Sequence, residues 1–511
     1  MEIDQRLWGE YKKIRNKIRA TQLDESIYVI WNYLNYLMNG ESGFVDIEVS
    51  KEFLMKDYIQ RRRTLNEWEL QSLLREVIIH SQEKTYKPKS FRKMRYFSDS
   101  INMLKEFSNT VAKTYISSEN AEKGILIEFH RLAHQQFSWQ TKIANGIYLT
   151  RYAKIFKNNE VKEIVKNKIG MDIDKFYFIV MIIYGYFIGK KIAIDYPPRI
   201  EVENVAQNDL EKVFKFLCIS IEEMREITNR MHKVNQDFGY TLNQNEVFPL
   251  IKMDYFGKKS LVCPNTRTLF WRITDGLYYE LCRENNFDRA FGNSFQEYIG
   301  EIIKKVCEKT DFFEEVNYGS RHNNKQSIDW LLEDDNSLIF IECKTKRMRN
   351  ESKTNLTNTT CLEEDIDKMA DFIIQTYKQI KDYKDNLYSH CKYKSCKKIY
   401  PLIVTLEEWY VFGMIYTKVE EKVKQKLQDN NLPESFLGDF PFTVCSVDTF
   451  EGFIQLIENA GIEKVMSKKT TMPEKEYDLM VVLKNNFNEE MKKTKFLFEE
   501  DFEKILPKKY Y

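Results

Sequence analysis

Apolar residues recur every three or four positions through most of the first half of the chain, which is the spacing of amphipathic helices. Proline is absent before Pro88, in agreement with long uninterrupted helices. Pro197, Pro198 and the polar residues after them mark a joint near 195–208. We therefore predict a mainly α-helical domain over residues 1–285. Its expected helices cover 26–34, 73–79, 101–115, 121–137, 142–156, 174–190 and 219–234.

After residue 286, short apolar runs alternate with helical patterns. Phe295, Ile299 and Ile303 repeat at helical spacing, and three strands, a helix and a further strand are expected to follow. This order predicts an α/β domain over residues 286–410, with a central mixed β-sheet flanked by helices. The strands are expected at 312–318, 327–332, 337–343 and 399–405, and the helix at 361–386. Residues 411–511 are predicted to form an α/β extension, with a strand at 442–447, packed on this domain.

Charged residues interrupt the predicted hairpin formed by the second and third of these strands. Asp329 stands alone in the first arm, and the second arm ends in Glu342, Cys343 and Lys344. Side chains two apart in a strand share a face, so Glu342 and Lys344 point the same way and Cys343 points opposite. The neighbouring strand is expected to bring Asp329 onto that face. Two carboxylates and an ammonium beside an apolar sheet are costly unless a divalent cation or a substrate neutralises them.

Composition narrows the class of protein. The 511 residues are too many for one ordinary domain, and 43% apolar residues are enough for substantial cores. Because 78 Lys and Arg balance 77 Asp and Glu, any surface that binds a polyanion must be local. The nine cysteines are scattered, which suits a reducing cytoplasm. The most membrane-like run, 176–189, is shorter than the roughly 20 residues that a spanning helix needs, so no membrane association is expected.

Three other segments contain residues of the kinds that bind metal ions or nucleic acid. His130 and His134 lie four apart, which suits two imidazoles on one helix face, but no third metal ligand accompanies them. Residues 84–97 interleave cations with aromatic residues, a composition that suits nucleic acid as well as a solvated loop. His390, Cys391 and Cys396 lack the paired spacing of a zinc site.

The residues of the α/β domain resemble the PD-(D/E)xK, or restriction-endonuclease-like, nuclease superfamily. The resemblance covers about residues 286–409 and rests on Glu297 in the first helix, Asp329, and the run Glu342 to Lys344. Gln379 and Tyr383 in the following helix are similar to the Q-x-x-x-Y element of the exonuclease-like branches. Ile328 stands where the superfamily name has proline.

The resemblance implies a site for one or two Mg²⁺ or Mn²⁺ ions. It assigns the metal ligands as Asp329, Glu342, the Cys343 carbonyl and Glu297, with Glu301 as the alternative helix-borne acid. Lys344 would orient or deprotonate the attacking water, or stabilise the transition state. The resemblance also implies substrate contacts from Gln379 and Tyr383, and the cations that follow the strand are placed to hold phosphates: Lys346, Arg347 and Arg349.

We therefore expect a metal-dependent nuclease that acts on nucleic acid, with DNA favoured over RNA. The long helical half resembles the architecture of bacterial anti-phage defence nucleases, in which such a part senses, recruits or assembles, so it is the expected site of a protein partner or a homo-oligomer contact. Two alternatives stay open: a DNA-repair or recombination nuclease, and a non-catalytic nucleic-acid-binding or assembly module. No Walker A motif is present, so ATP-driven translocation would require another subunit.

Overall fold

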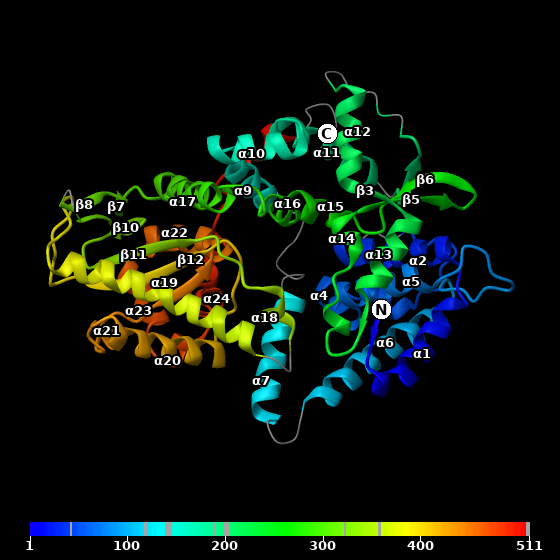
Figure 1. The fold of residues 1–511 in the computed structure, drawn as a ribbon, viewed down its shortest axis with the longest axis horizontal. Coiled ribbons are helices and arrows are strands. Elements are labelled where there is room, and N and C mark those ends of the chain that lie inside the picture. The colour runs from blue at the N-terminus through cyan, green and yellow to red at the C-terminus, as the bar shows by residue number, and fades with distance from the viewer. Residues whose placement is uncertain are drawn as a thin grey trace.

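The computed structural model describes residues 1–40, 43–116, 121–137, 146–188, 191–198, 200, 205–320, 323–355 and 359–506. A mainly helical N-terminal half lies beside a half built on a mixed β-sheet, which confirms the predicted fold class (Figure 1). Parts of three predictions lie outside the described residues: the beginning of the helix expected from 142, the end of the helix expected at 174–190, and the middle of the joint near 195–208.

The predicted helices of the first half are present, and several begin at capped ends. Asp4 accepts a hydrogen bond from the backbone of Arg6 at the first of them, and Asn66 with Glu69 forms a capping box at α5. The helices of this half are α1 (Gln5–Arg19), α2 (Leu23–Asn39), α3 (Lys51–Met55), α4 (Tyr58–Thr64), α5 (Glu67–His80), α6 (Met94–Tyr115), α7 (Ala121–Leu132), the π-helical η2 (Ala133–Phe137), α9 (Gly146–Lys157), α10 (Asn159–Ile169), α11 (Ile173–Ile188), α12 (Gln207–Leu217), α13 (Ile221–Met231), the 3-10 helix η3 (Phe238–Tyr240), α14 (Gln244–Val247), α15 (Thr266–Ile273) and α16 (Asp275–Leu281).

Strands also occur in this half and were not predicted. A four-stranded sheet has the order β2-β6-β5-β3, and the first residues of the chain pair with a strand after α13. The segment 219–234, expected to be helical throughout, therefore has a strand at each end. These strands are β1 (Glu2–Ile3), β2 (Ala193–Asp195), β3 (Cys218–Ser220), β4 (Lys233–Val234), β5 (Leu250–Tyr255) and β6 (Lys258–Val262). In the described part of the chain, no helix has both the length and the apolar character needed to span a membrane.

The second half is organised around a five-stranded sheet of order β13-β12-β11-β10-β7. Strands β11, β12 and β13 are parallel, and β10 runs antiparallel to both of its neighbours. The expected strand at 312–318 is divided between the sheet and a separate β8–β9 hairpin. The strands are β7 (Asp311–Glu314), β8 (Asn317–Ser320), β9 (Asn323–Gln326), β10 (Trp330–Glu333), β11 (Ser337–Lys344), β12 (Lys398–Thr405) and β13 (Thr443–Ser446).

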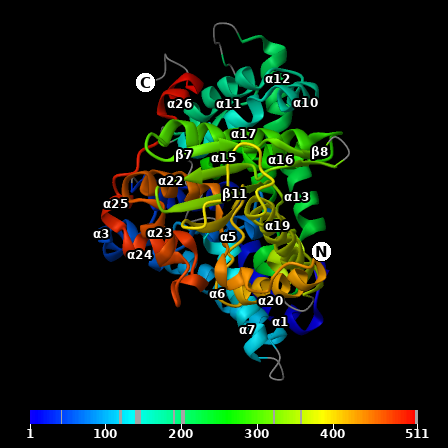
Figure 2. The same ribbon diagram turned by 90° about the vertical axis from the view of Figure 1, so that its left-hand side faces the viewer.

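Helices cover both faces of this sheet, with α17 on one side and α19 on the other (Figure 2). Residues 411–506 contribute strand β13 and several of the covering helices, so the C-terminal extension completes the sheet. The helices are α17 (Phe287–Val306), α18 (Asn350–Thr354), α19 (Thr360–Lys384), α20 (Met414–Asp429), α21 (Phe436–Asp439), α22 (Val447–Ala460), α23 (Ile462–Lys469), η4 (Glu474–Glu476), α24 (Leu479–Asn486), α25 (Asn488–Met491) and α26 (Glu499–Ile505).

Three apolar cores hold these elements together. The face of the sheet under α17 shares its core with α9, α10 and α11, so apolar packing continues across residue 285. The opposite face packs Leu331 and Phe340 against α19. A third core joins α1, α2, α5 and α6 to strands β5 and β6. The sheet is thus anchored through α17 to the helical half, and α19 covers the face that carries the charged residues of the hairpin.

Candidate active site

Three acidic residues lie side by side at one end of strands β11, β10 and β7. Trp330 pairs with Ile341 of β11 on one side and with Glu314 at the end of β7 on the other. Asp329 precedes Trp330 and Glu315 follows Glu314, each just outside its strand, so the same register places Asp329 between Glu342 and Glu315. Trp330 and Ile341 face the core under α17, whereas Leu331 and Phe340 face the core under α19, so the side chains of Asp329 and Glu342 point toward the α19 face. They lie at the edge where the parallel strands β11, β12 and β13 end, which we call the carboxyl edge.

Backbone and side-chain contacts fix the predicted triad. The backbone N–H of Cys343 donates to Asp329 Oδ2 at 2.7 Å. Lys344 Nζ donates to Glu342 Oε1 and to Gln375 Oε1, the second at 3.2 Å, and lies 5.1 Å from the centroid of the Phe372 ring. Glu342 is 2% exposed, and Asp329 and Lys344 are half-buried. The structure therefore brings Asp329, Glu342 and Lys344 together, with Gln375 of α19 as a further contact.

The two carboxylates are poorly compensated. Burial and the nearby charge of Glu342 raise the pKa of Asp329 well above its usual value, although the Cys343 N–H opposes that rise. Burial also raises the pKa of Glu342 despite the opposing charge of Lys344. Glu315 adds to the rise for both acids. One ammonium thus faces three acids at this edge, and a bound cation would relieve the remaining repulsion.

The donor set fits a hard divalent ion that keeps water as a ligand. In the described part of the chain, no three His, Cys, Asp or Glu side chains form a ready-made metal group. Mg²⁺ is commonly held by one or two carboxylates and completes its octahedron with water and substrate phosphate. Asp329, Glu342 and the Cys343 carbonyl supply such a partial set, which leaves positions for the substrate. The arrangement suits an ion that arrives hydrated better than an enclosed structural site.

Glu315 and Gln296 belong to this edge and were not predicted. Gln296 Nε2 donates to Glu315 Oε2 at 3.1 Å, and the Gln296 carbonyl accepts a hydrogen bond from Trp330 Nε1, also at 3.1 Å. This pair of bonds joins α17 to β7 and β10 beside Asp329. Glu315 stood inside a predicted strand, but its position next to Asp329 depends on a pairing of β7 with β10 that local sequence patterns do not reveal.

The helix-borne acids that the resemblance proposed lie elsewhere. Glu297 is exposed and accepts a hydrogen bond from Asn158 Nδ2, and Glu301 pairs with Lys154 at 2.7 Å. Within the described residues, neither acid has a recorded contact with Asp329 or Glu342. Because α17 packs on the face opposite the carboxylates, its contact with the acidic row comes from Gln296 at the edge.

The proposed Q-x-x-x-Y residues are engaged in internal contacts. Gln379 Nε2 donates to the Gln326 carbonyl at 2.8 Å, and Gln379 Oε1 accepts from the Tyr388 hydroxyl at 2.8 Å. Tyr383 is fully buried, and its hydroxyl donates to the Lys392 carbonyl at 3.0 Å. Both side chains therefore connect α19 to neighbouring segments of the chain. The glutamine that reaches the triad is Gln375, one helical turn before Gln379.

The three cations after Lys344 have different environments. Lys346 is exposed. Arg347 is buried, pairs with Asp275 at 2.8 Å and donates to the Tyr152 hydroxyl at 2.9 Å, so it links β11 to α16 and α9. Arg349 pairs with Asp365 at 3.2 Å, and also with Glu364. Of the predicted phosphate-binding cations, Lys346 is therefore exposed and can contact a phosphate, whereas Arg347 is engaged in a buried ion pair.

The other candidate segments do not assemble a metal site in the described residues. The rings of His130 and His134 lie 4.6 Å apart, and burial lowers the pKa of His130 to about 4. His390 stacks on Tyr388 with ring centroids 5.3 Å apart. Residues 84–97 form a loop and the start of α6, with Tyr86 fully on the surface.

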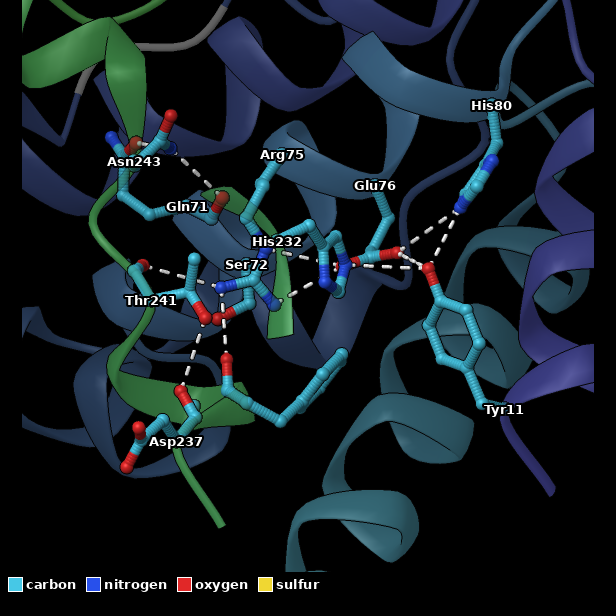
Figure 3. Close-up of polar contacts among 12 residues, drawn as sticks. Tyr11, Gln71, Ser72, Arg75, Glu76, His80, His232, Asp237, Thr241 and Asn243 are labelled. Atoms are coloured by element: carbon cyan, nitrogen blue, oxygen red, sulfur yellow. Dashed lines mark hydrogen bonds and ion pairs between the residues drawn. The ribbon is translucent and has the colours of Figure 1, made fainter. Parts of the chain in front are cut away.

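A buried polar cluster around one acid, Glu76, lies in the helical half and was also not predicted (Figure 3). Glu76 of α5 accepts hydrogen bonds from the Tyr11 hydroxyl at 2.7 Å and from Arg75 Nε at 3.1 Å, and it pairs with His232 Nε2 at 2.7 Å. The Tyr11 hydroxyl also meets His80 Nε2 at 2.7 Å. These contacts join α1, α5 and the residue after α13 in the core of that half.

The sheet edge therefore combines clustered carboxylates, a fixed ammonium and one exposed lysine close by. This arrangement can bind a divalent cation and a phosphate together, and it can stabilise charge that develops on a phosphate oxygen. Compared with models of protein families, with curated proteins and with solved structures, the chain matches none.

Proposed function

We propose that the chain is a metal-dependent nuclease that hydrolyses phosphodiester bonds at the carboxyl edge of its five-stranded sheet. The observation that carries the proposal is the convergence of Asp329, Glu342 and Lys344 on one face, where Glu342 is buried, Asp329 is half-buried and the acids outnumber the cation. Structural ion pairs rarely leave such an imbalance, because uncompensated buried charge is costly. The same residues carry the resemblance to the PD-(D/E)xK nucleases.

Each residue has a task that follows from its contacts. Asp329 and Glu342, with the Cys343 carbonyl, would hold Mg²⁺ or Mn²⁺, and the Cys343 N–H keeps the Asp329 carboxylate in place. The bound ion supplies Lewis-acid stabilisation of phosphate charge and a more acidic water. Glu342 and Gln375 hold the Lys344 ammonium at the same face, where its charge would stabilise the developing negative charge on the phosphate.

DNA is the favoured substrate, and a role in bacterial defence or restriction is the favoured setting. Both choices follow from the resemblance and from the large helical half attached to the sheet. That half has an apolar core of its own, and we assign to it the contact with a protein partner or a second copy of the chain. The nuclease chemistry itself does not depend on this choice of setting.

Cleavage assays with matched variants test the proposal. The wild-type chain, Asp329→Asn and Lys344→Ala are incubated with plasmid, linear duplex, single-stranded DNA and RNA in Mg²⁺, Mn²⁺ or EDTA. Glu333→Gln is the matched control, because Glu333 is also a buried acid on the α19 face of the same strand and pairs with Lys397 at the other end. We expect metal-dependent cleavage by the wild type and the control, and losses of about 10²- to 10³-fold or more in the two site variants. Cleavage that persists in EDTA, or equal rates in all four proteins, would contradict the proposal.

A further inference from the structure

A groove begins where the chain leaves β11 beyond Lys344. It has a volume of about 440 Å³ and is lined by residues of α16, of the first turn of α17 and of α18. Its size falls within the range of about 300–1,000 Å³ that is usual for pockets binding small molecules, so it suits a nucleotide unit better than a duplex. The residues that matter for its chemistry are Tyr278, Tyr279, Lys346, Asn350 and Lys353, with one acid, Asp288, among the cations Lys346, Arg347, Arg349 and Lys353.

One wall of the groove is aromatic, and neighbouring side chains contact its rings. Tyr279 is 48% exposed, although it belongs to a helix packed into the core. Trp271 stacks beside it with ring centroids 6.3 Å apart and ring planes inclined by 25°. The Arg347 guanidinium lies 4.0 Å from the Tyr278 ring centroid and 5.1 Å from that of Tyr279. A tyrosine ring that is held in place yet exposed is the kind of surface on which unpaired bases stack.

One cation of the groove is available to a phosphate. Arg347, Arg349 and Lys353 are each paired with an acid, the last with Glu407 at 2.6 Å. Within the described residues, the Lys346 side chain forms no ion pair or hydrogen bond, and it is exposed. Lys346 follows Lys344 by two residues, which span about 7 Å in extended chain. A phosphate at Lys346 would therefore lie close to one held at the triad.

We propose that this groove binds an unpaired segment of the nucleic-acid strand beside the bond that is cut. A base stacks on Tyr279, and a phosphate of the same strand pairs with Lys346. Bases inside a duplex are already stacked, so the preferred substrate has a single-stranded end, flap or gap at this point. This inference rests on the proposed nuclease function, because it places the groove next to the reacting phosphate.

Binding without cleavage tests the groove separately from the chemistry. A short labelled oligonucleotide is supplied as single-stranded DNA, as the same sequence in RNA, and as a DNA duplex, with Ca²⁺ in place of Mg²⁺, and fluorescence anisotropy is measured. We expect Tyr279→Ala to weaken single-strand binding about 5- to 100-fold and Tyr279→Phe to retain it, since stacking requires the ring alone. Lys346→Gln should reduce the salt dependence of binding by about 0.7 in log–log slope, the contribution of one phosphate contact.

The controls match the exposure and charge of the tested residues. Tyr477→Ala removes another surface tyrosine, 42% exposed, and Lys464→Gln removes an exposed lysine of α23, whose neighbour Glu463 bonds to Ser337 at the opposite edge of the sheet. Both should bind like the wild type. The affinities for single-stranded DNA and single-stranded RNA are expected to differ less from each other than either differs from the affinity for the duplex.

Several results would overturn the inference. These are unchanged binding by Tyr279→Ala, an equal loss in Tyr477→Ala, preference for the duplex, or a loss in Tyr86→Ala instead, which would place the strand on residues 84–97. The proposed function fails in a different way. A chain that binds single strands through Tyr279 yet never cleaves any substrate with Mg²⁺ or Mn²⁺ contradicts hydrolysis and supports the groove. Cleavage of duplex that is indifferent to Tyr279→Ala contradicts the groove and supports hydrolysis.

Discussion

Two clusters of charged residues, one around Glu76 and one around Asp329, differ in how their charge is compensated. In the helical half, burial alone would raise the pKa of Glu76, but His232 and Arg75 outweigh burial and hold that pKa far below its usual range. At the carboxyl edge of the sheet, burial and neighbouring acids raise the pKa of Asp329. The Lys344 ammonium there donates its hydrogen bond to Glu342. A buried charge that neighbouring opposite charges compensate has a structural role. A buried charge that lacks this compensation indicates a candidate ligand-binding site.

The largest expected effect on stability comes from breaking the compensated cluster. Glu76→Gln removes the charge that Arg75, His232 and the Tyr11 hydroxyl share, so buried polar groups lose their partner. We expect the local free energy of unfolding of the helical half to fall by about 3–5 kcal/mol. Hydrogen exchange of α1 and α5 measures this change. Glu10→Gln, which removes an exposed acid of α1 paired with Lys13, should change it by less than about 0.5 kcal/mol.

A pH titration gives the next largest effect in the same cluster. Burial lowers the pKa of His80 to about 4, against the opposing charge of Glu76. The unfolded chain then takes up a proton near the ordinary value of about 6.5, and the folded chain does so only at lower pH. Stability contributed by neutral His80 is therefore complete above pH 6.5 or so and is lost as the pH falls toward 4, by up to about 3 kcal/mol.

Protection of α5 in hydrogen exchange, followed from neutral to acidic pH, measures this loss. His80→Gln keeps a polar side chain but does not titrate, and it should flatten the pH dependence in this window. A dependence as steep in His80→Gln as in the wild type would mean that another group is responsible.

Removing a charge from the uncompensated cluster around Asp329 should not lower the free energy of unfolding, in contrast to Glu76→Gln. Asp329→Asn retains an oxygen that can accept the Cys343 N–H bond and removes a charge that Glu342 and Glu315 oppose. Without metal, we expect the free energy of unfolding of the sheet to stay constant or rise by about 1–2 kcal/mol, as measured by hydrogen exchange of β10 and β11. In Glu333→Gln, by contrast, Lys394 and Lys397 lose their partner, and stability should fall. A loss in Asp329→Asn as large as that in Glu333→Gln would make Asp329 a structural acid.

The smallest effects separate two glutamines of α19. Gln375 is exposed and holds Lys344, so Gln375→Ala should lower the cleavage rate about tenfold and leave stability unchanged. Gln379 accepts from Tyr388 and donates to the Gln326 carbonyl, so Gln379→Ala should cost about 1 kcal/mol of stability and leave the cleavage rate per folded molecule unchanged. Steady-state kinetics combined with denaturant unfolding resolves the two. The reverse result would restore Gln379 as the substrate-contacting residue.

Local patterns were sufficient for part of the site. The alternation of a single strand places Glu342 and Lys344 together, and the short turn of the hairpin brings Asp329 to them. The helix–strand order likewise indicated the mixed sheet and the helical half. These features depend on residues close in sequence, where backbone periodicity alone decides which side chains meet.

Other parts depend on contacts between distant segments. Glu315 joins the site only because β7 pairs with β10, and Gln375 replaces Gln379 because of the rotational setting of α19 over the sheet. The sequence predicted that Arg347 holds a phosphate, but in the structure Arg347 pairs with Asp275 of α16. Four strands of the helical half, β1 to β4, have only two or three residues each, too few to show a period. Each of these features is set by tertiary packing, which overrides local patterns.

The central claim is that a divalent cation compensates Asp329 and Glu342, and the effect of Mn²⁺ on unfolding tests it most directly. The unfolding free energies of the wild type and Asp329→Asn are compared with Mn²⁺ and with EDTA. At an ion concentration one hundred times its Kd, binding should stabilise the wild type by about 2.7 kcal/mol, and Asp329→Asn should gain far less. Equal stabilisation of both proteins by Mn²⁺, or of neither, would contradict the claim.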